Sequence, residues 1–382
     1  MGLALSGPPR PDPAAILARI RTVAHHWSDQ QVEGLNNLGI ELVSGIASFE
    51  APNQVVVKPS NGEADIPLKA DAVIIATGSV PFFPPNLKPD GKRILAPRFA
   101  SHLEALPEDI IVIGAGATGS EFTYLFNRVG VKVTWLVDPH GVLPAFAPAA
   151  GQFLAETLAR RGVHLAANQV ADRLEADETG VTVTTSSGAQ YRAAMVFVAI
   201  GRFPDLSRLN LTAVGLPVPA GQTMPTDNFG RSPIPAIYAV GDAAGAPMLA
   251  NRAMAQAWVA GRHAAGVETP PFRSETVIHA IYTEPQAAQV GRVTGEDLQT
   301  VRLAFTAGLK AHLLPEGAGL FELAYDRDRR VAGGVAVGPH AADALAPVAL
   351  AIQMGASLGD MAAVQGAHPT VSELAFMAAR SV

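Results

Sequence analysis

A histidine and a glutamate stand five residues apart in GAHPTVSE, residues 366–373. The pattern predicts an acid–base pair in which Glu373 orients His368 and stabilises its protonated form, as the acid does in nucleophile–base–orienter arrangements. A structural alternative is a capping box, TVSE, with Thr370 as the N-cap of a helix and Glu373 at its third position. One glutamate can serve both purposes, so both interpretations stay open.

The composition limits what such a pair can serve. The 382 residues contain no cysteine, which excludes a cysteine nucleophile, disulfides and thiolate metal sites within them, and we predict no metal site. Apolar residues make up 48%, charged residues 16%, and the net charge is -6, which argues against nucleic acid as a partner. No apolar run reaches the roughly 18 residues that span a bilayer, and no signal peptide is apparent, so we expect a cytoplasmic protein.

A glycine-rich segment, GAGATG at 114–119, directly follows an apolar stretch and precedes a helical pattern. In the dinucleotide fingerprint, Gly114 permits the tight turn, Gly116 lets the backbone approach a pyrophosphate, and Gly119 lets the helix pack closely on the strand. The free N–H groups of the helix start then face the phosphates. The strand–helix context favours this interpretation over a simple tight turn.

An acidic residue follows the next strand, in VTWLVDPHG. Asp138 lies about twenty residues after the fingerprint, where an acid binds the ribose 2′-hydroxyl of NAD. No Arg or Lys occurs from 133 to 141 to favour a 2′-phosphate, so the sequence favours NAD over NADP. A solvated turn aspartate before Pro139 is the alternative.

A second glycine–acid pair, Gly241 and Asp242, ends the apolar stretch IYAVGDAAG. Open α/β sheets bind ligands at the carboxyl ends of their strands, so Asp242 could accept a hydrogen bond from a ribityl hydroxyl. It could equally cap the helix expected from 252 to 265.

The elements needed to position these residues alternate along most of the chain. A helix is expected over 13–38, and two similar apolar strands, in ADAVIIATGSVP (70–81) and AAMVFVAIGRFP (193–204), each end in glycine. Strands and helices alternate between them, which predicts a doubly wound parallel sheet. After Val277 the strands are grouped and two helical segments follow, which predicts a separate α+β domain.

Taken in order, the motifs resemble the pyridine nucleotide–disulfide oxidoreductases, most closely the dihydrolipoyl dehydrogenases. The motifs that carry the resemblance are ATGS (76–79), GAGATGSE (114–121), VAIGRFP (198–204), IYAVGDAAG (237–245), IYTEP (281–285) and HPTVSE (368–373). The resemblance implies an α/β fold with two Rossmann-like dinucleotide-binding domains and a C-terminal α+β dimerisation domain. It implies an FAD domain formed by residues 1–96 and 221–270, an NAD domain formed by residues 97–220, and a dimerisation domain formed by residues 271–382.

The resemblance also implies the roles of individual residues. His368 and Glu373 are implied to be the acid–base pair that serves the cysteine pair of the partner subunit in a homodimer, and Glu121 to lie near the nicotinamide. Gly201 is implied to line the nicotinamide nucleotide site. The residues implied to face FAD are Thr77, Gly78, Gly241 and Asp242.

Two departures from this family stand out. Its NAD-binding members usually carry an acid at the position of Val137, one residue before Asp138. The family also begins with its own GxGxxG and a CxxxxC redox pair, whereas residues 1–69 contain neither, and a βαβ unit needs roughly 30 residues or more. We therefore expect that the FAD domain of this sequence is incomplete in its first part and that these residues alone bind FAD weakly or not at all.

Three functions fit these observations. The leading one is an FAD-dependent NAD(P)H–disulfide oxidoreductase acting on a small disulfide or lipoyl-type substrate. A relative without a disulfide, such as a soluble pyridine nucleotide transhydrogenase, would suit the absence of cysteine. The third is a non-catalytic, flavin-free NAD-binding dimer.

Overall fold

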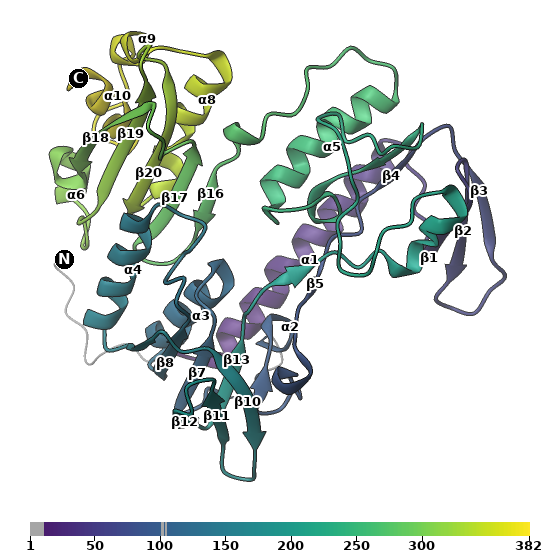
Figure 1. Ribbon diagram of the computed structural model, residues 1–382, viewed down its shortest axis with the longest axis horizontal. Helices are drawn as coiled ribbons and strands as arrows, with labels where there is room; N and C mark the ends of the chain where they lie inside the picture. Colours follow the sequence, from purple (N-terminus) through teal and green to yellow (C-terminus); the bar gives the residue numbers. More distant parts are fainter. Residues whose placement is uncertain (1–10, 101–102, 104) are drawn as a thin grey trace. The chain divides into compact units, whose positions relative to one another are not determined.

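The computed structural model describes residues 11–100, 103 and 105–382, and it divides the chain into two compact units (Figure 1). The first unit contains residues up to Ser28, Phe83–Gly201 and Ile278–Val382; the second contains Asp29–Phe82 and Arg202–Val277. Each unit therefore joins segments that are far apart in the sequence. No helix in the described ranges is long and apolar enough to cross a membrane.

A five-stranded parallel sheet forms the centre of the first unit. Its spatial order is β6 (Ile94–Leu95), β13 (Met195–Val198), β7 (Asp109–Ile113), β8 (Lys132–Val137) and β9 (His164–Ala167). The carboxyl ends of β7 and β13 lie side by side, because Ile113 pairs with Val198. The sheet therefore brings the fingerprint after β7 and the glycine after β13 to one edge.

Both faces of this sheet are covered, which explains its near-continuous apolar strands. On one face, Val112 and Trp135 pack in a cluster with residues of α3 (Ala117–Arg128) and α4 (Pro148–Arg160). On the other face, Ile111 and its neighbours pack against a three-stranded antiparallel sheet. The strands of that second sheet are β10 (Ala171–Ala176), β11 (Val181–Thr185) and β12 (Gln190–Ala193).

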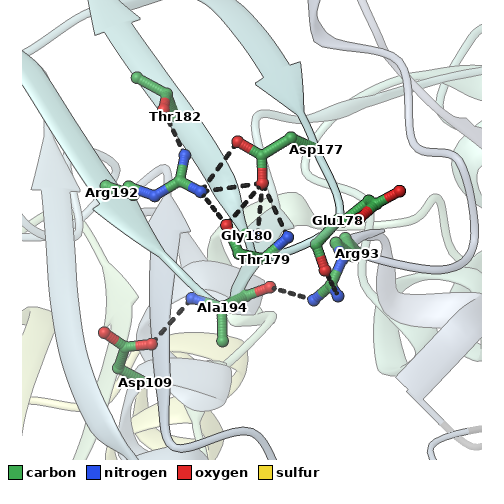
Figure 2. A network of polar contacts seen from close by, with 9 residues as sticks. All are labelled: Arg93, Asp109, Asp177, Glu178, Thr179, Gly180, Thr182, Arg192 and Ala194. Atoms are coloured by element: carbon green, nitrogen blue, oxygen red, sulfur yellow. Dashed lines mark hydrogen bonds and ion pairs between the residues drawn. The ribbon is translucent and has the colours of Figure 1, made fainter.

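The turn between β10 and β11 is held by a network of polar contacts (Figure 2). One guanidinium nitrogen of Arg192 lies 2.8 Å from both carboxylate oxygens of Asp177, and Asp177 also accepts from the backbone N–H of Thr179 at 2.8 Å. Hydrogen bonding from Arg192 holds the pKa of the Asp177 carboxyl below its ordinary value. Arg93 donates to the carbonyl of Glu178 at 2.5 Å, which ties the turn to the start of β6.

The C-terminal part of the first unit contains a five-stranded antiparallel sheet. Its order is β16 (His279–Ile281), β17 (Gln286–Gly291), β20 (Val331–Gly338), β19 (Leu320–Asp326) and β18 (Leu298–Ala304). The helices of this part are α6 (Leu309–His312), α7 (Ala341–Ala344), α8 (Ala346–Met354), α9 (Leu358–Ala363) and α10 (Glu373–Arg380). Phe321 and Leu323 of β19 share an apolar cluster with Leu358 and Leu374, so helices α9 and α10 pack on this sheet.

The second unit contains the other glycine-ended strands. β4 (Val73–Ile75) and β15 (Ile237–Ala239) pair in parallel and end at the same edge, and α5 (Ala250–Ala264) follows. A three-stranded antiparallel sheet packs beside them. Its strands are β1 (Gly45–Ala51), β2 (Gln54–Pro59) and β3 (Ile66–Lys69). Phe49 of β1 and Ile75 of β4 lie in one apolar cluster, which joins the two sheets.

Three short elements and one long helix complete the α-helices and strands of the described residues. They are β5 (Val80–Pro81), which pairs with β14 (Arg202–Phe203), α2 (Pro97–Ala100) and α1 (Pro13–Asn37). Helix α1 confirms the helix expected at 13–38, yet none of its residues is buried.

The expected α/β fold class with a C-terminal α+β domain is confirmed. Strand lengths differ from expectation, because only 73–75 of the apolar run 70–81 pair with β15, and β5 turns away to pair with β14. The compact units divide after Gly201 rather than after residue 220, since Leu206 and Leu211 pack in the cluster with Phe49. The domain limits expected from the sequence stay predictions.

Candidate coenzyme and acid–base sites

The fingerprint turn lies between β7 and α3. Gly114 has φ +103°, a conformation that residues with a side chain rarely adopt, and α3 begins after Gly116. A Cβ atom on Gly119 would lie 2.0 Å from the carbonyl oxygen of Gly114, so the helix can approach the turn this closely only with glycine. No side chain caps the start of α3, which leaves its first N–H groups available to an anion.

The segment after β13 touches this turn at one position and leaves open space at two others. A Cβ on Gly114 would lie 2.3 Å from the carbonyl oxygen of Ala199, which places the turn directly against the segment after β13. At Gly116 and Gly201, by contrast, a Cβ atom would meet no other heavy atom within 4 Å among the described residues. The edge therefore combines one tight backbone contact with two open glycine positions, as a pyrophosphate site requires.

Trp135 supports this turn from inside the sheet, a role that no sequence pattern indicates. Its side chain is fully buried, and its indole N–H donates to the carbonyl of Gly114 at 2.9 Å. The backbone N–H of Leu143 donates to the carbonyl of Ala115 at 2.8 Å. The turn is thus held by hydrogen bonds that leave its outer surface free.

Asp138 follows β8 at the edge of a cavity of about 440 Å³. Among the residues that line the cavity are Asp138, Gly141, Leu143 and Leu165. The side chain of Asp138 is 50% exposed, whereas Val137 is 2% exposed. Of positions 137 and 138, only 138 faces solvent, and this is the position of the acid. Its carboxylate also accepts from the backbone N–H of His140 at 2.9 Å, so Asp138 does shape the turn.

Glu121 lies on the surface of α3 and contacts the IYTEP segment, 281–285. Its carboxylate accepts from the backbone N–H of Tyr282 at 2.9 Å. On the next turn of α3, the hydroxyl of Tyr124 donates to the carboxylate of Glu284 at 3.3 Å, and burial raises the pKa of Tyr124. Arg128 lies 3.7 Å from the same carboxylate. This face of α3 therefore holds residues 281–285 in place, and one carboxylate oxygen of Glu121 takes part by accepting the Tyr282 hydrogen bond.

In the second unit, the residues expected to face FAD gather where β4 and β15 end. Gly78 has φ +70° and leaves its surroundings open, and Thr77 beside it is exposed. The hydroxyl of Ser79 donates to Asp242 at 2.6 Å and accepts from Arg202 at 2.8 Å. Ser79 is not among the predicted site residues, although it completes the ATGS motif that carries the other two.

Two side chains of α5 hold the loop that carries Asp242. Gln256 accepts from the backbone N–H of Gly241 at 2.9 Å, and Arg252 donates to the carbonyls of Gly241 at 3.2 Å and Gly245 at 2.6 Å. Burial lowers the pKa of Arg252. The alternative that Asp242 caps the following helix is wrong, because the N-cap of α5 is Leu249 and Asp242 pairs with Ser79.

His368 and Glu373 meet as the spacing predicts. The Nδ1 atom of His368 lies 2.9 Å from one carboxylate oxygen of Glu373, and the other oxygen accepts from the backbone N–H of Thr370 at 2.7 Å. The His368 side chain is 64% exposed and that of Glu373 only 18%. The hydrogen bond from Thr370 lowers the pKa of Glu373, with a further contribution from His368, which keeps the carboxylate charged.

The capping-box expectation is half right. Glu373 reaches back to the N–H of Thr370, but α10 has Ser372 at its N-cap and no side chain that caps it. The hydroxyl of Thr370 donates to the carbonyl of Ala367 at 2.8 Å, and the N-cap of α10 is Ser372 rather than Thr370. Glu373 therefore fixes both the turn and the imidazole, and among the described residues Nε2 of His368 has no partner.

The predicted residues fall into three groups. Those of the NAD side lie in the first unit: Gly114, Gly116, Gly119, Glu121, Asp138 and Gly201. His368 and Glu373 form a second group in that unit, and the residues of the FAD side lie in the second unit. Residues 11–100, 103 and 105–382 contain no cluster of three potential metal ligands.

The residues present fit a nicotinamide nucleotide and one part of FAD, its ribityl chain. An uncapped helix start, open glycines and the exposed Asp138 beside a cavity suit the pyrophosphate and ribose of a nicotinamide nucleotide. The Asp242 carboxylate and the open Gly78 suit a hydroxylated chain such as the ribityl part of FAD.

Comparison with known proteins gives the family. The family model described as pyridine nucleotide-disulphide oxidoreductase matches residues 7–257, and the model of its dimerisation domain matches residues 277–379. The chain belongs to the pyridine nucleotide–disulphide oxidoreductases. It is therefore an FAD- and NAD(P)-dependent oxidoreductase, and the family expected from the motifs is confirmed.

Relatives of known name cover most of the chain. A dihydrolipoyl dehydrogenase 2 of Haloarcula marismortui is 32% identical over 96% of this chain and 81% of its own length. An NAD(P)H dehydrogenase (quinone) of Mycobacterium tuberculosis is 31% identical over 96% of this chain and 76% of its own. The crystal structure of LpdA from M. tuberculosis superposes with a TM-score of 0.92 at 30% identity, over 98% of this chain and 84% of that one.

We predict that Gly116→Ala weakens NADH binding without loss of stability. Gly116 has φ -74° and open space at its Cβ position, so alanine fits the fold but stands where the pyrophosphate approaches. Titration with NADH should show at least a tenfold loss of affinity, about 1.4 kcal/mol or more. Gly119→Ala is the matched comparison and should lower the melting temperature as well, because its Cβ meets the Gly114 carbonyl. Unchanged NADH affinity in Gly116→Ala would mean that the coenzyme binds elsewhere.

Proposed function

We propose that this oxidoreductase uses NADH to reduce a disulfide and that His368 exchanges the thiol proton. The observation that carries the proposal is the His368–Glu373 pair, with its 2.9 Å contact and an imidazole that is 64% exposed. In the net reaction, NADH, one proton and a disulfide give NAD⁺ and two thiols. FAD, when bound, would supply the two-electron transfer between the nicotinamide and the disulfide.

The protein's own residues supply the proton chemistry. Glu373 holds Nδ1 of His368 with one oxygen and is itself held by Thr370 through the other, so the ring has a fixed orientation. The charged carboxylate stabilises the imidazolium, and Nε2 is left to exchange a proton with a thiolate. A carboxylate bound at both oxygens limits rotation of the imidazole, which is what a positioned acid–base group needs.

The disulfide itself must come from outside these residues, because they contain no cysteine. The names of two groups of relatives suggest different acceptors. The dihydrolipoyl dehydrogenases point to a small cyclic disulfide of lipoyl type, which agrees with the retained histidine. This is the substrate class that we favour.

Quinone reduction is a second candidate. It needs no thiol, which agrees with the absence of cysteine, and a relative 31% identical is named NAD(P)H dehydrogenase (quinone). His368 then has no thiol to serve, so the two candidates differ in how strongly activity depends on this residue.

We predict that His368→Gln lowers disulfide reduction by the FAD-loaded protein by about 10²- to 10⁴-fold, the usual worth of a positioned general acid–base. Oxidation of NADH by ferricyanide, which takes up no proton at a sulfur, should stay nearly intact. Glu373→Gln should cost less, because it removes an orienting charge and keeps the proton carrier. Steady-state assays with a lipoyl-type disulfide and with ferricyanide separate the two steps. Equal losses in both assays would make His368 a structural residue.

We also propose NADH as the preferred coenzyme, on the basis of Asp138. Its exposed carboxylate stands beside the cavity after β8, where it would repel a 2′-phosphate. We predict that NADH binds at least about tenfold more tightly than NADPH, a difference of roughly 1.4 kcal/mol. Asp138→Asn keeps the acceptor for the N–H of His140 but loses the charge, so titration should show a smaller ratio. Tighter binding of NADPH by the wild type would refute the assignment.

A homodimer built through the C-terminal part is the assembly we propose, supported by the dimerisation-domain match over 277–379. Helix α8 exposes two large apolar side chains one turn apart, Leu350 at 63% and Met354 at 73%. Such exposed pairs suit an interface, and obligate dimers bury upwards of roughly 2,000 Å².

We predict that Leu350→Lys weakens this dimer, because a charge would be buried in an apolar contact. Light scattering at micromolar concentration should show a dimer for the wild type and a larger monomer fraction for the variant. Leu38→Lys changes an equally apolar side chain, 77% exposed in the other unit, and should leave the dimer intact. A monomeric wild type would contradict the proposal.

A further inference from the structure

One face of helix α10 contacts the whole segment that carries His368. Glu373, Phe376 and Arg380 are spaced three and four residues apart, so their side chains leave the helix on the same side. Arg380 bonds the start of residues 362–370, Phe376 lies against Gly366, and Glu373 bonds His368 and Thr370.

Arg380 holds the beginning of this segment. Its Nε donates to the carbonyl of Ala362 at 2.9 Å, and its Nη2 donates to the carbonyl of Val364 at 2.5 Å. These carbonyls end helix α9, where the last carbonyl groups of a helix have no partner within the helix. A cation at this end also interacts favourably with the helix dipole, so Arg380 acts as a side-chain cap of α9.

Phe376 holds the middle of the segment. A Cβ atom on Gly366 would lie 3.0 Å from two carbons of the Phe376 ring and 3.4 Å from Cγ of Glu373. The backbone therefore passes directly over this ring, and a residue larger than glycine would push it away. Only Ala367 separates this contact from His368.

We propose that Arg380 is a positioning residue for His368: by capping α9 it fixes the start of the segment whose end Glu373 holds. This inference rests on the proposed proton-transfer role of His368 for its functional meaning. The geometry makes the segment a short span held at both ends by one helix. Loss of the Arg380 contact frees the start of this span and leaves the contacts with Phe376 and Glu373.

The charge of Arg380 acts on the pair as well. It contributes to lowering the pKa of Glu373, after the hydrogen bond from Thr370 and the contact with His368. Removal of this charge should therefore move the titration of the Glu373 carboxyl to higher pH. Lysine at position 380 would keep the charge but could not reproduce the two-nitrogen contact with Ala362 and Val364.

Hydrogen exchange of the FAD-loaded protein tests this inference without any assay of activity. In Arg380→Met we expect the amide of Val364 to exchange about tenfold faster, the effect of losing roughly 1.4 kcal/mol of local stability. The amide of Thr370, which stays bonded to Glu373, should change less. The Glu373 carboxyl, followed by carbon-13 NMR, should titrate at higher pH in Arg380→Met, whereas Arg380→Lys should restore this titration and only part of the protection.

The matched control is Arg173→Met, which removes an exposed arginine whose ion pair with Glu175 is 3.5 Å long and distant in sequence from the segment. It should change neither measurement. Unchanged exchange at 364–370 in Arg380→Met would overturn the inference. So would faster exchange spread evenly over the C-terminal sheet, since that would make Arg380 a general structural residue.

The disulfide assay then separates the two proposals. Arg380→Met should lower disulfide reduction by about tenfold, corresponding to a misplaced rather than a missing acid–base group, with ferricyanide reduction unchanged. If His368→Gln proves fully active while Arg380→Met still loosens 364–370, the proton-transfer role fails and the positioning of the segment stands.

Discussion

The close approach of α3 to the turn after β7 is the constraint on which the coenzyme site depends. A helix can point its N–H groups at a pyrophosphate only if it begins immediately beside the strand end. The 2.0 Å that would separate a Cβ on Gly119 from the Gly114 carbonyl shows that no side chain fits there. The indole N–H of the buried Trp135 donates to the same carbonyl at 2.9 Å and so also keeps the turn in this position.

The acid–base pair is built on another principle, in which one carboxylate satisfies two donors. Glu373 is mostly buried and holds a backbone N–H and an imidazole at once, while His368 stays 64% exposed. The buried Glu373 fixes the geometry of the pair, and the exposed imidazole of His368 stays accessible to a reactant. The same division occurs in the second unit, where the buried Arg252 and Gln256 hold the loop that presents Asp242.

The sequence predicted those features that depend on local spacing. Hydrophobic periodicity predicted helix α1 and the parallel strands. The spacing of particular residue types predicted the fingerprint and the contact between His368 and Glu373. The roles of Trp135, Ser79 and Arg380 were not predictable in this way, because each partner lies far away in the sequence or is a backbone carbonyl. A carbonyl is present in every residue, so no sequence pattern marks it as an acceptor.

The hydroxyl of Thr370 was expected to cap α10, but it donates to the carbonyl of Ala367. Both a capping box and a histidine–carboxylate pair use the glutamate of TVSE in the same way. They differ in the partner of the threonine hydroxyl. Its bond to the Ala367 carbonyl closes the turn beside His368 instead of capping α10. Local competition between side-chain and backbone partners decides such cases. Because the glutamate reaches Thr370 in both arrangements, the functional prediction for Glu373 is independent of that outcome.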